Sequence, residues 1–398
     1  MRSLQIGLLG KANVGKSTFF SAATETPVSS GNFPFTTIEP NVGVAYVKAD
    51  CACKHFKIEH QSDLCVKGTR FIPVKLIDIA GLVPGAHEGK GLGNQFLDDA
   101  RQAEVLIHVI DIAGTTDIQG QPVPPGTHNP LEDVEFVQDE FDLWFADILK
   151  REWDKITREI HQKRAKLTDG ITKRFTGLGI KDFQVQDVLQ KLGFISRDPK
   201  EWTEDDIVEF ARELRKNTKP MIIAANKADL CPDLEIIKKI NDNVIPCSAE
   251  TELLLRKASK AGIVNYSSGD EGFTVADGKE IAPPQQKALD LVKSVFEKIP
   301  STGIQKILNT AVFDSLNFIV VYPVEDETKL TNKDGVVLPD TKLLPQDSTA
   351  KDLAELIHAD IAKGFLHAID CKTKQRISGD QKLKNGDVIK IVSTLSRG

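Results

Sequence analysis

A short stretch near the amino terminus has the residue types and spacing of a phosphate-binding loop. Residues 10–18 read GKANVGKST, which is the pattern G-x-x-x-x-G-K-[ST]. In this pattern the glycines let backbone N–H groups turn toward an anion, the lysine reaches the β- and γ-phosphates, and the serine hydroxyl ligates Mg2+. We therefore predict a nucleoside triphosphate site that includes Gly10, Lys11, Ala12, Asn13, Val14, Gly15, Lys16, Ser17 and Thr18.

The elements needed to position this loop are present on both sides of it. The apolar run 4–9 predicts a β-strand that leads into the loop, and the amphipathic run 18–24 predicts a helix that leaves it. The phosphates would then rest on the amino terminus of a helix, where backbone N–H groups and the helix dipole favour an anion.

Two further segments supply candidate metal ligands and a contact to the γ-phosphate. Asp78 and Gly81 form a D-x-x-G pattern at the end of a predicted strand, residues 71–77. Such an aspartate holds Mg2+, here through water, and the glycine amide can meet the γ-phosphate. In the loop 32–43 we expect Thr37, with Thr36 as the next candidate, to give Mg2+ a second hydroxyl. The predicted metal site is therefore Ser17 and Thr37, with Asp78 acting indirectly.

A later motif indicates which base is bound. The apolar strand predicted over residues 220–225 ends at Asn226, Lys227 and Asp229, in the pattern N-K-x-D. The aspartate can accept hydrogen bonds from both N1–H and the 2-amino group of guanine, which adenine does not offer. After the next predicted strand, three residues are expected to contact the base edge: Ser248, Ala249 and Glu250.

A long helical block separates these motifs and divides the chain into three domains. We predict a discontinuous α/β nucleotide domain over 1–132 and 217–316, a helical insert over 133–216, and a small α+β domain over 317–398. Within the insert, residues 150–181 are dense in lysine and arginine. A solvated helical face is the commoner explanation of such density, and RNA contact is the alternative.

The six cysteines are few for 398 residues and are not spaced as a disulfide framework, so a reducing cytoplasm is expected. Cys51, Cys53 and Cys65, with His55 and His60 nearby, raise the alternative of a zinc site. A C-x-C pair followed by one distant cysteine is not a standard zinc spacing, and reduced thiols on a surface hairpin are the favoured interpretation.

The overall composition excludes some classes of partner. No apolar run approaches 18 residues, so no membrane contact is expected, and the chain begins Met1-Arg2-Ser3 with no room for a cleavable signal. The net charge of −6 gives no global attraction to nucleic acid, so RNA contact would need a local basic patch. We expect a monomer.

Residues 32–41 (NFPFTTIEPN) and 78–86 (DIAGLVPGA) resemble the Obg superfamily of GTPases, and the helical insert and C-terminal domain resemble its YchF branch. The resemblance covers nearly the whole chain. It implies a Ras-like P-loop G domain, a coiled-coil insert, a C-terminal TGS domain of β-grasp fold, and association with the ribosome through rRNA or ribosomal protein.

The resemblance also implies roles for single residues. Asn13 matches the asparagine of potassium-activated GTPases, so K+ joins Mg2+ as a candidate cofactor. Leu82 stands where Ras-like enzymes carry the water-orienting glutamine, and slow hydrolysis is expected. His108 matches a histidine proposed to assist hydrolysis, with His87 as a rival, although a buried core histidine is the ordinary interpretation of His108. Obg-like ATPases blur the base motif, whereas here it is intact.

The predicted function is Mg2+-dependent hydrolysis of GTP to GDP and phosphate as a conformational switch, with Lys16, Asn13 and Gly81 in the catalytic machinery. One alternative is a nucleotide-gated binding module that hydrolyses GTP negligibly, and another is an ATP-preferring Obg-like ATPase. A small-molecule kinase is disfavoured by N-K-x-D.

Overall fold

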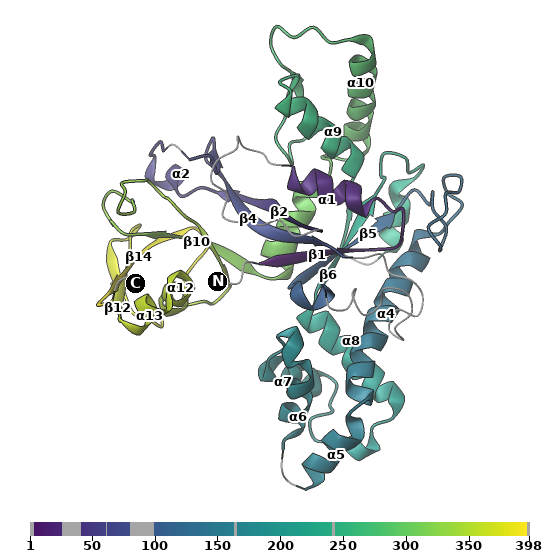
Figure 1. Ribbon diagram of the computed structural model, residues 1–398, viewed down its shortest axis with the longest axis vertical. Coiled ribbons are helices and arrows are strands. Elements are labelled where there is room, and N and C mark those ends of the chain that lie inside the picture. The colour runs from purple at the N-terminus through teal and green to yellow at the C-terminus, as the bar shows by residue number, and fades with distance from the viewer. Residues whose placement is uncertain are drawn as a thin grey trace.

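The computed structural model of the chain describes residues 4–25, 41–60, 62–79, 99–162, 165–240 and 243–395. Its centre is a seven-stranded sheet in the order β2-β4-β1-β5-β6-β7, with β3 paired to β4 (Figure 1). The strands are β1 (Gln5–Leu9), β2 (Val42–Asp50), β3 (Cys65–Val66), β4 (Thr69–Asp78), β5 (Val105–Asp111), β6 (Met221–Asn226) and β7 (Val244–Pro246).

The strand directions explain where a ligand can bind. Strands β4, β1, β5, β6 and β7 are parallel to one another, and β2 runs antiparallel to β4. Every residue of β5 is buried, as expected for a central parallel strand covered on both faces. Because parallel strands end at one edge of a sheet, the loops after β1, β4, β5 and β6 meet there.

Helices cover both faces of this sheet. On one face lie α1 (Lys16–Thr24) and α11 (Ile304–Asn309), whose buried side chains share a core with Ile6 and Leu8 of β1. On the other face, α4 (Pro130–Lys150) joins a second core that contains Leu106 of β5. Residues beyond the base motif form α9 (Ala249–Lys260), α10 (Pro283–Lys298) and the hairpin β8 (Val264–Asn265) and β9 (Thr274–Val275).

The helical insert extends away from the sheet, on the side opposite to α9 and α10 (Figure 1). After α4 it contains α5 (Trp153–His161), α6 (Leu167–Phe175), α7 (Asp182–Lys191) and α8 (Glu204–Thr218). The predicted boundaries at 133 and 216 fall inside α4 and α8. Helix α4 begins earlier because Pro130 occupies its first turn and the Asn129 side chain accepts a hydrogen bond from the Leu131 amide, 3.2 Å.

The C-terminal domain is a five-stranded mixed sheet in the order β11-β10-β14-β12-β13. Its strands are β10 (Phe318–Val324), β11 (Lys342–Pro345), β12 (Phe365–Asp370), β13 (Gln375–Ile377) and β14 (Asp387–Ser393). Helices α12 (Ala350–Ile357) and α13 (Ala359–Lys363) pack on it. This is the α+β arrangement that the sequence predicted.

The C-terminal domain lies beside the β2–β4 edge of the central sheet (Figure 1). The Tyr322 hydroxyl of β10 donates a 2.9 Å hydrogen bond to the Asp50 carbonyl at the end of β2, and the Arg70 guanidinium of β4 donates to the Pro339 carbonyl at 3.3 Å.

Among the described residues, no helix is long and apolar enough to cross a membrane.

Candidate nucleotide-binding site

The loop between β1 and α1 has the backbone of a phosphate cradle. Gly10 and Gly15 have φ angles of 144° and 94°, and a Cβ atom at either position would lie 2.3 Å from a neighbouring atom, the Val109 carbonyl oxygen or the Asn226 Nδ2. Only glycine fits at both positions. Helix α1 begins at Lys16 without a side-chain cap, so its first N–H groups remain available to an anion.

The Lys16 ammonium is held inside this loop. Its Nζ donates to the carbonyl oxygens of Gly10 at 2.8 Å and Lys11 at 2.7 Å. Burial lowers the pKa of Lys16, and the negative charge of Asp78 acts in the opposite direction. The two carbonyl oxygens that accept from this ammonium carry no net charge. A bound γ-phosphate would supply the negative charge that the ammonium needs.

Asp78 and Ser17 form the part of the site that suits Mg2+. Asp78 ends β4, and the exposed Ser17 Oγ donates to its Oδ2 at 3.3 Å. Burial raises the pKa of Asp78, while Lys16 and the hydrogen bond from Ser17 lower it. The buried Asp78 Oδ1 has no hydrogen-bond partner in the part of the chain that the structure describes. An unpartnered carboxylate oxygen beside a hydroxyl is the donor set that a hard cation with bound water requires.

The base motif is tied directly to the phosphate loop. Asn226, the last residue of β6, donates from Nδ2 to the Val14 carbonyl at 2.9 Å and accepts at Oδ1 from the Ala249 amide at 3.0 Å. One amide side chain therefore joins three segments that are far apart in sequence. Ser248 caps α9 by accepting from the Thr251 amide at 3.3 Å, which fixes the first turn of the helix, where Ala249 and Glu250 lie.

Lys227 and Asp229 complete the motif. Lys227 has a φ of 60°, and its Nζ donates to Asp111 Oδ2 at 2.9 Å and to Thr115 Oγ1 at 3.0 Å. The backbone of Asp229 is held by Lys298, which donates to its carbonyl at 2.7 Å. Within the described residues the half-buried Asp229 carboxylate makes no hydrogen bond, so both of its oxygens can accept from a base.

Sequence reasoning missed the residues that brace these motifs. Asp111 ends the buried strand β5 at the same sheet edge, and its Oδ2 accepts from the Thr115 amide at 3.1 Å, the Thr115 hydroxyl at 2.6 Å and the Thr116 hydroxyl at 2.9 Å. The position of an aspartate at the end of a predicted parallel strand was a usable signal. Asn13, the candidate K+ ligand, donates to the Gly120 carbonyl at 2.9 Å.

Lys11 plays a structural part that its place in the motif did not reveal. Its Nζ lies 2.8 Å from Asp133 Oδ2 and donates to the Thr116 carbonyl at 2.9 Å, and both charged side chains are almost fully buried. His128 contacts the other Asp133 oxygen at 2.8 Å. The Lys11 side chain thus connects the phosphate loop to α4, and only its backbone is left to meet a phosphate.

His108 is a core residue in this structure. It lies in β5 opposite Leu9 of β1, is fully buried, and neither ring nitrogen has a hydrogen-bond partner among the described residues. Burial, with smaller contributions from Lys16 and Lys11, lowers the pKa of His108 to about 3, so the ring is neutral at pH 7. The other predicted residues Thr36, Thr37, Gly81, Leu82 and His87 lie outside the described residues.

Three families match parts of the chain. Residues 5–138 match the 50S ribosome-binding GTPase family, residues 224–326 match the G4 motif-containing domain of the YGR210-like Obg-like GTPases, and residues 335–393 match the TGS domain. Together they account for the phosphate loop, the base motif and most of the C-terminal sheet.

Full-length relatives are similar over nearly the whole chain. An uncharacterized GTP-binding protein of Methanocaldococcus jannaschii is 46% identical over 396 residues, 98% of each chain. The ribosome-binding ATPase YchF of Bacillus subtilis is 26% identical over 92% of this chain and 88% of its own. A GTP-binding protein from Pyrococcus horikoshii superimposes with a TM-score of 0.78 at 38% identity, over 98% of this chain and all of the other. The chain belongs to the YchF branch of the Obg-like P-loop GTP-binding proteins.

Proposed function

We propose that this protein binds GTP with Mg2+ and hydrolyses the γ-phosphate as a conformational switch. The observation that carries the proposal is the Asn226 side chain, which joins the base motif to Val14 of the phosphate loop and to Ala249. This arrangement puts the free Asp229 carboxylate at the same sheet edge as Lys16. A purine nucleotide bound there would place its phosphates on the loop and its base on Asp229.

The proposed roles follow from the positions of the side chains. Lys16 and the amides at the start of α1 stabilise charge on the β- and γ-phosphates, and Ser17 and Asp78 hold Mg2+, which neutralises the developing charge when it is bound. We assign Thr37 to the second metal hydroxyl and the Gly81 amide to the γ-phosphate, from sequence alone. Because Leu82 replaces the water-orienting glutamine, unstimulated turnover should be slow.

The test is affinity and steady-state phosphate release with GTP and with ATP, each in Mg2+ with K+ or Na+. The proposal expects a strong preference for GTP, and K+ stimulation would support Asn13 as a cation ligand. Equal use of ATP would contradict guanine recognition and would indicate an ATP-preferring Obg-like ATPase. That alternative function is favoured by relatives that are themselves named ATPases. Tight GTP binding without multiple turnovers would instead indicate a nucleotide-gated binding module.

We also propose that the protein associates with the ribosome, because the matching family and the bacterial relatives are named for ribosome binding. The basic residues of the insert are the candidate RNA contact, although part of that charge is used internally: Glu152 pairs with Arg174 at 2.7 Å and Lys155 at 3.8 Å. Arg151 and Lys173 are exposed.

Ribosome pelleting across a salt series tests this surface. Charge reversal at Arg151 and Lys173 should weaken binding and flatten its salt dependence. Reversal of exposed Lys287 on α10 is the matched control. Equal pelleting of both variants and the unchanged protein would exclude the insert face.

A further inference from the structure

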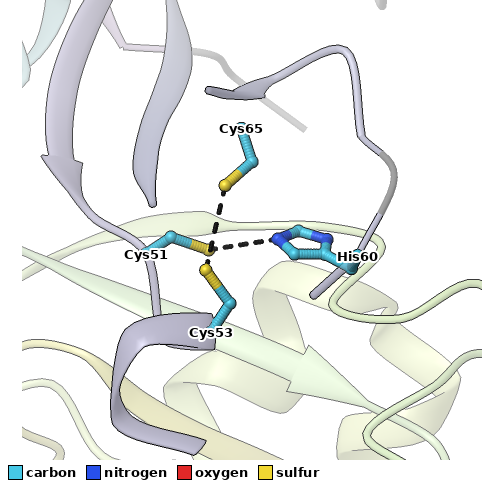
Figure 2. Close-up of side chains that lie close together, drawn as sticks. All are labelled: Cys51, Cys53, His60 and Cys65. Carbon is cyan, nitrogen blue, oxygen red and sulfur yellow. Dashed lines mark hydrogen bonds between the residues drawn. The ribbon is translucent and has the colours of Figure 1, made fainter. Parts of the chain in front are cut away.

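A group of four potential metal ligands lies far from the nucleotide edge, between the central sheet and the C-terminal domain. Cys51, Cys53, His60 and Cys65 each direct one ligand atom to a common centre, and these four atoms all lie within 4.8 Å of one another (Figure 2). Cys51 and Cys53 are buried, with 2% and 6% of their surface exposed. The interpretation of these thiols as surface groups is therefore wrong.

The distances fit a tetrahedral metal site. The Cys51 Sγ and His60 Nε2 are 3.5 Å apart, and the Cys53 and Cys65 sulfur atoms are 4.0 Å apart. A tetrahedron with Zn–S bonds of about 2.3 Å and a Zn–N bond of about 2.0 Å has edges of roughly 3.8 Å between sulfurs and roughly 3.5 Å between sulfur and nitrogen. The ligands would need to move only slightly to close around one ion. Disulfides do not explain the cluster, because all three cysteines are free.

The chain is folded locally to bring these ligands together. Cys51 follows the end of β2, and Cys53 begins the short helix α2 (Cys53–Phe56). Lys57, at a φ of 52°, ends that helix and turns the chain toward His60. Cys65 returns on β3, which pairs with β4. Because the hairpin and the helical turn set the approach, the irregular spacing C-x-C-x6-H-x4-C still converges.

The charge balance around the cluster also favours a negatively charged group at this position. Arg70 of β4 is 1% exposed, its Nε has no partner, and its remaining contacts are the Ser62 hydroxyl at 3.2 Å and the Pro339 carbonyl. Among the described residues, no carboxylate pairs with this buried cation. Buried charges are normally paired. A Zn2+ ion with three thiolates and a neutral histidine carries one net negative charge, which would balance Arg70.

We propose that Cys51, Cys53, His60 and Cys65 bind one structural Zn2+ ion that fixes the segment between β2 and β4 where it packs against the C-terminal domain. Four protein ligands leave no open position, so the site is structural rather than catalytic. Cys51 and Cys53 share a core with Tyr322, Val324 and Leu338 of the C-terminal side. Metal binding would therefore stiffen the junction between the nucleotide domain and that domain.

The first test is the metal content of the full-length protein after expression and reconstitution with Zn2+. Mass spectrometry should find about one Zn2+ per chain, and Co2+ in its place should give thiolate charge-transfer bands and intense tetrahedral d–d bands. Absence of bound zinc in the folded protein, or a Cys53–Cys65 disulfide found by thiol titration without reductant, would overturn the proposal.

Variants then assign the ligands. The double variant Cys53→Ser, Cys65→Ser should lose the metal and the charge-transfer bands, and His60→Asn should shift the d–d bands. Cys371→Ser, at another buried free cysteine of the C-terminal domain, is the matched control and should keep one Zn2+. Full metal content in the double variant would exclude these ligands. Because the site lies apart from the phosphate loop, GTP affinity should be unchanged in all of them, so failure here leaves the proposed function standing.

Discussion

The first residues of strand β4, which include Arg70, lie beside the thiol cluster, and the strand ends in the nucleotide site at Asp78. At its carboxyl end, contiguous motifs after parallel strands supply the candidate contacts that the structure describes, and the loops leave amides and carboxylate oxygens open to a ligand. At its amino end, four potential metal ligands from a hairpin and a helical turn converge within 4.8 Å of one another, beside the buried side chain of Arg70. An open sheet edge therefore suits a nucleotide that exchanges, whereas a closed cluster of four ligands suits an ion that stays bound.

Removal of the ammonium group in the phosphate loop should have the largest effect of all, and it should affect only the nucleotide site at the carboxyl end of β4. Lys16→Ala removes the cation that Gly10 and Lys11 hold in the loop, and we expect about a 1,000-fold or greater loss of GTP turnover. Steady-state phosphate release measures the loss. Zinc content should stay the same, and a matching loss of zinc would show that the variant is misfolded rather than inactive.

Lys11→Met tests whether a residue of the motif acts on structure rather than on nucleotide. It leaves Asp133 buried beside His128 alone, and we expect a loss of about 3 kcal/mol in the free energy of unfolding, the low end for a broken buried pair. Denaturant unfolding measures this loss. Intact stability with greatly weakened GTP binding would show that the Lys11 side chain serves the nucleotide.

Arg70→Met should have an effect that depends on the metal. With zinc bound it removes the partner of an anionic cluster, and we expect a loss of about 1.5–3 kcal/mol in the free energy of unfolding. After removal of zinc by a chelator the loss should be smaller, because the arginine is then itself an uncompensated buried charge. Equal losses in both forms would contradict charge balance as the role of Arg70.

His108→Leu should have the smallest effect at pH 7, because its influence on stability is confined to acid. The pKa of His108 falls from 6.5 to about 3 on folding, so its contribution to stability is complete above pH 6.5 and is lost as the pH falls toward 3. This one group contributes up to about 1.4 kcal/mol per pH unit in that window. The thermal unfolding midpoint should therefore fall less steeply between pH 7 and pH 4 in the variant than in the unchanged protein. An equally steep fall in both proteins would contradict this role of His108 in the pH dependence of stability. Unchanged GTP turnover in the variant would exclude His108 from catalysis.

The two ends also differ in how far sequence predicted them. Gly10 to Ser17 and Asn226 to Asp229 were predictable because each motif is contiguous and follows a strand whose carboxyl end faces the ligand. The bracing role of Asp111 and the Lys11–Asp133 pair depend on packing between segments over 100 residues apart, which no local pattern encodes. The convergence of Cys51, Cys53, His60 and Cys65 was not predictable, because their spacing is irregular and depends on the αL turn at Lys57.

Recognition of guanine by Asp229 is tested most directly by calorimetric titration of Asp229→Asn with GTP and with xanthosine triphosphate. The substitution removes an acceptor for the 2-amino group and adds an amide donor, which matches the 2-carbonyl of xanthine. We expect GTP affinity to fall roughly 100-fold and affinity for xanthosine triphosphate to rise. Unchanged GTP affinity, with no gain for the xanthine nucleotide, would contradict guanine recognition at this edge of the sheet.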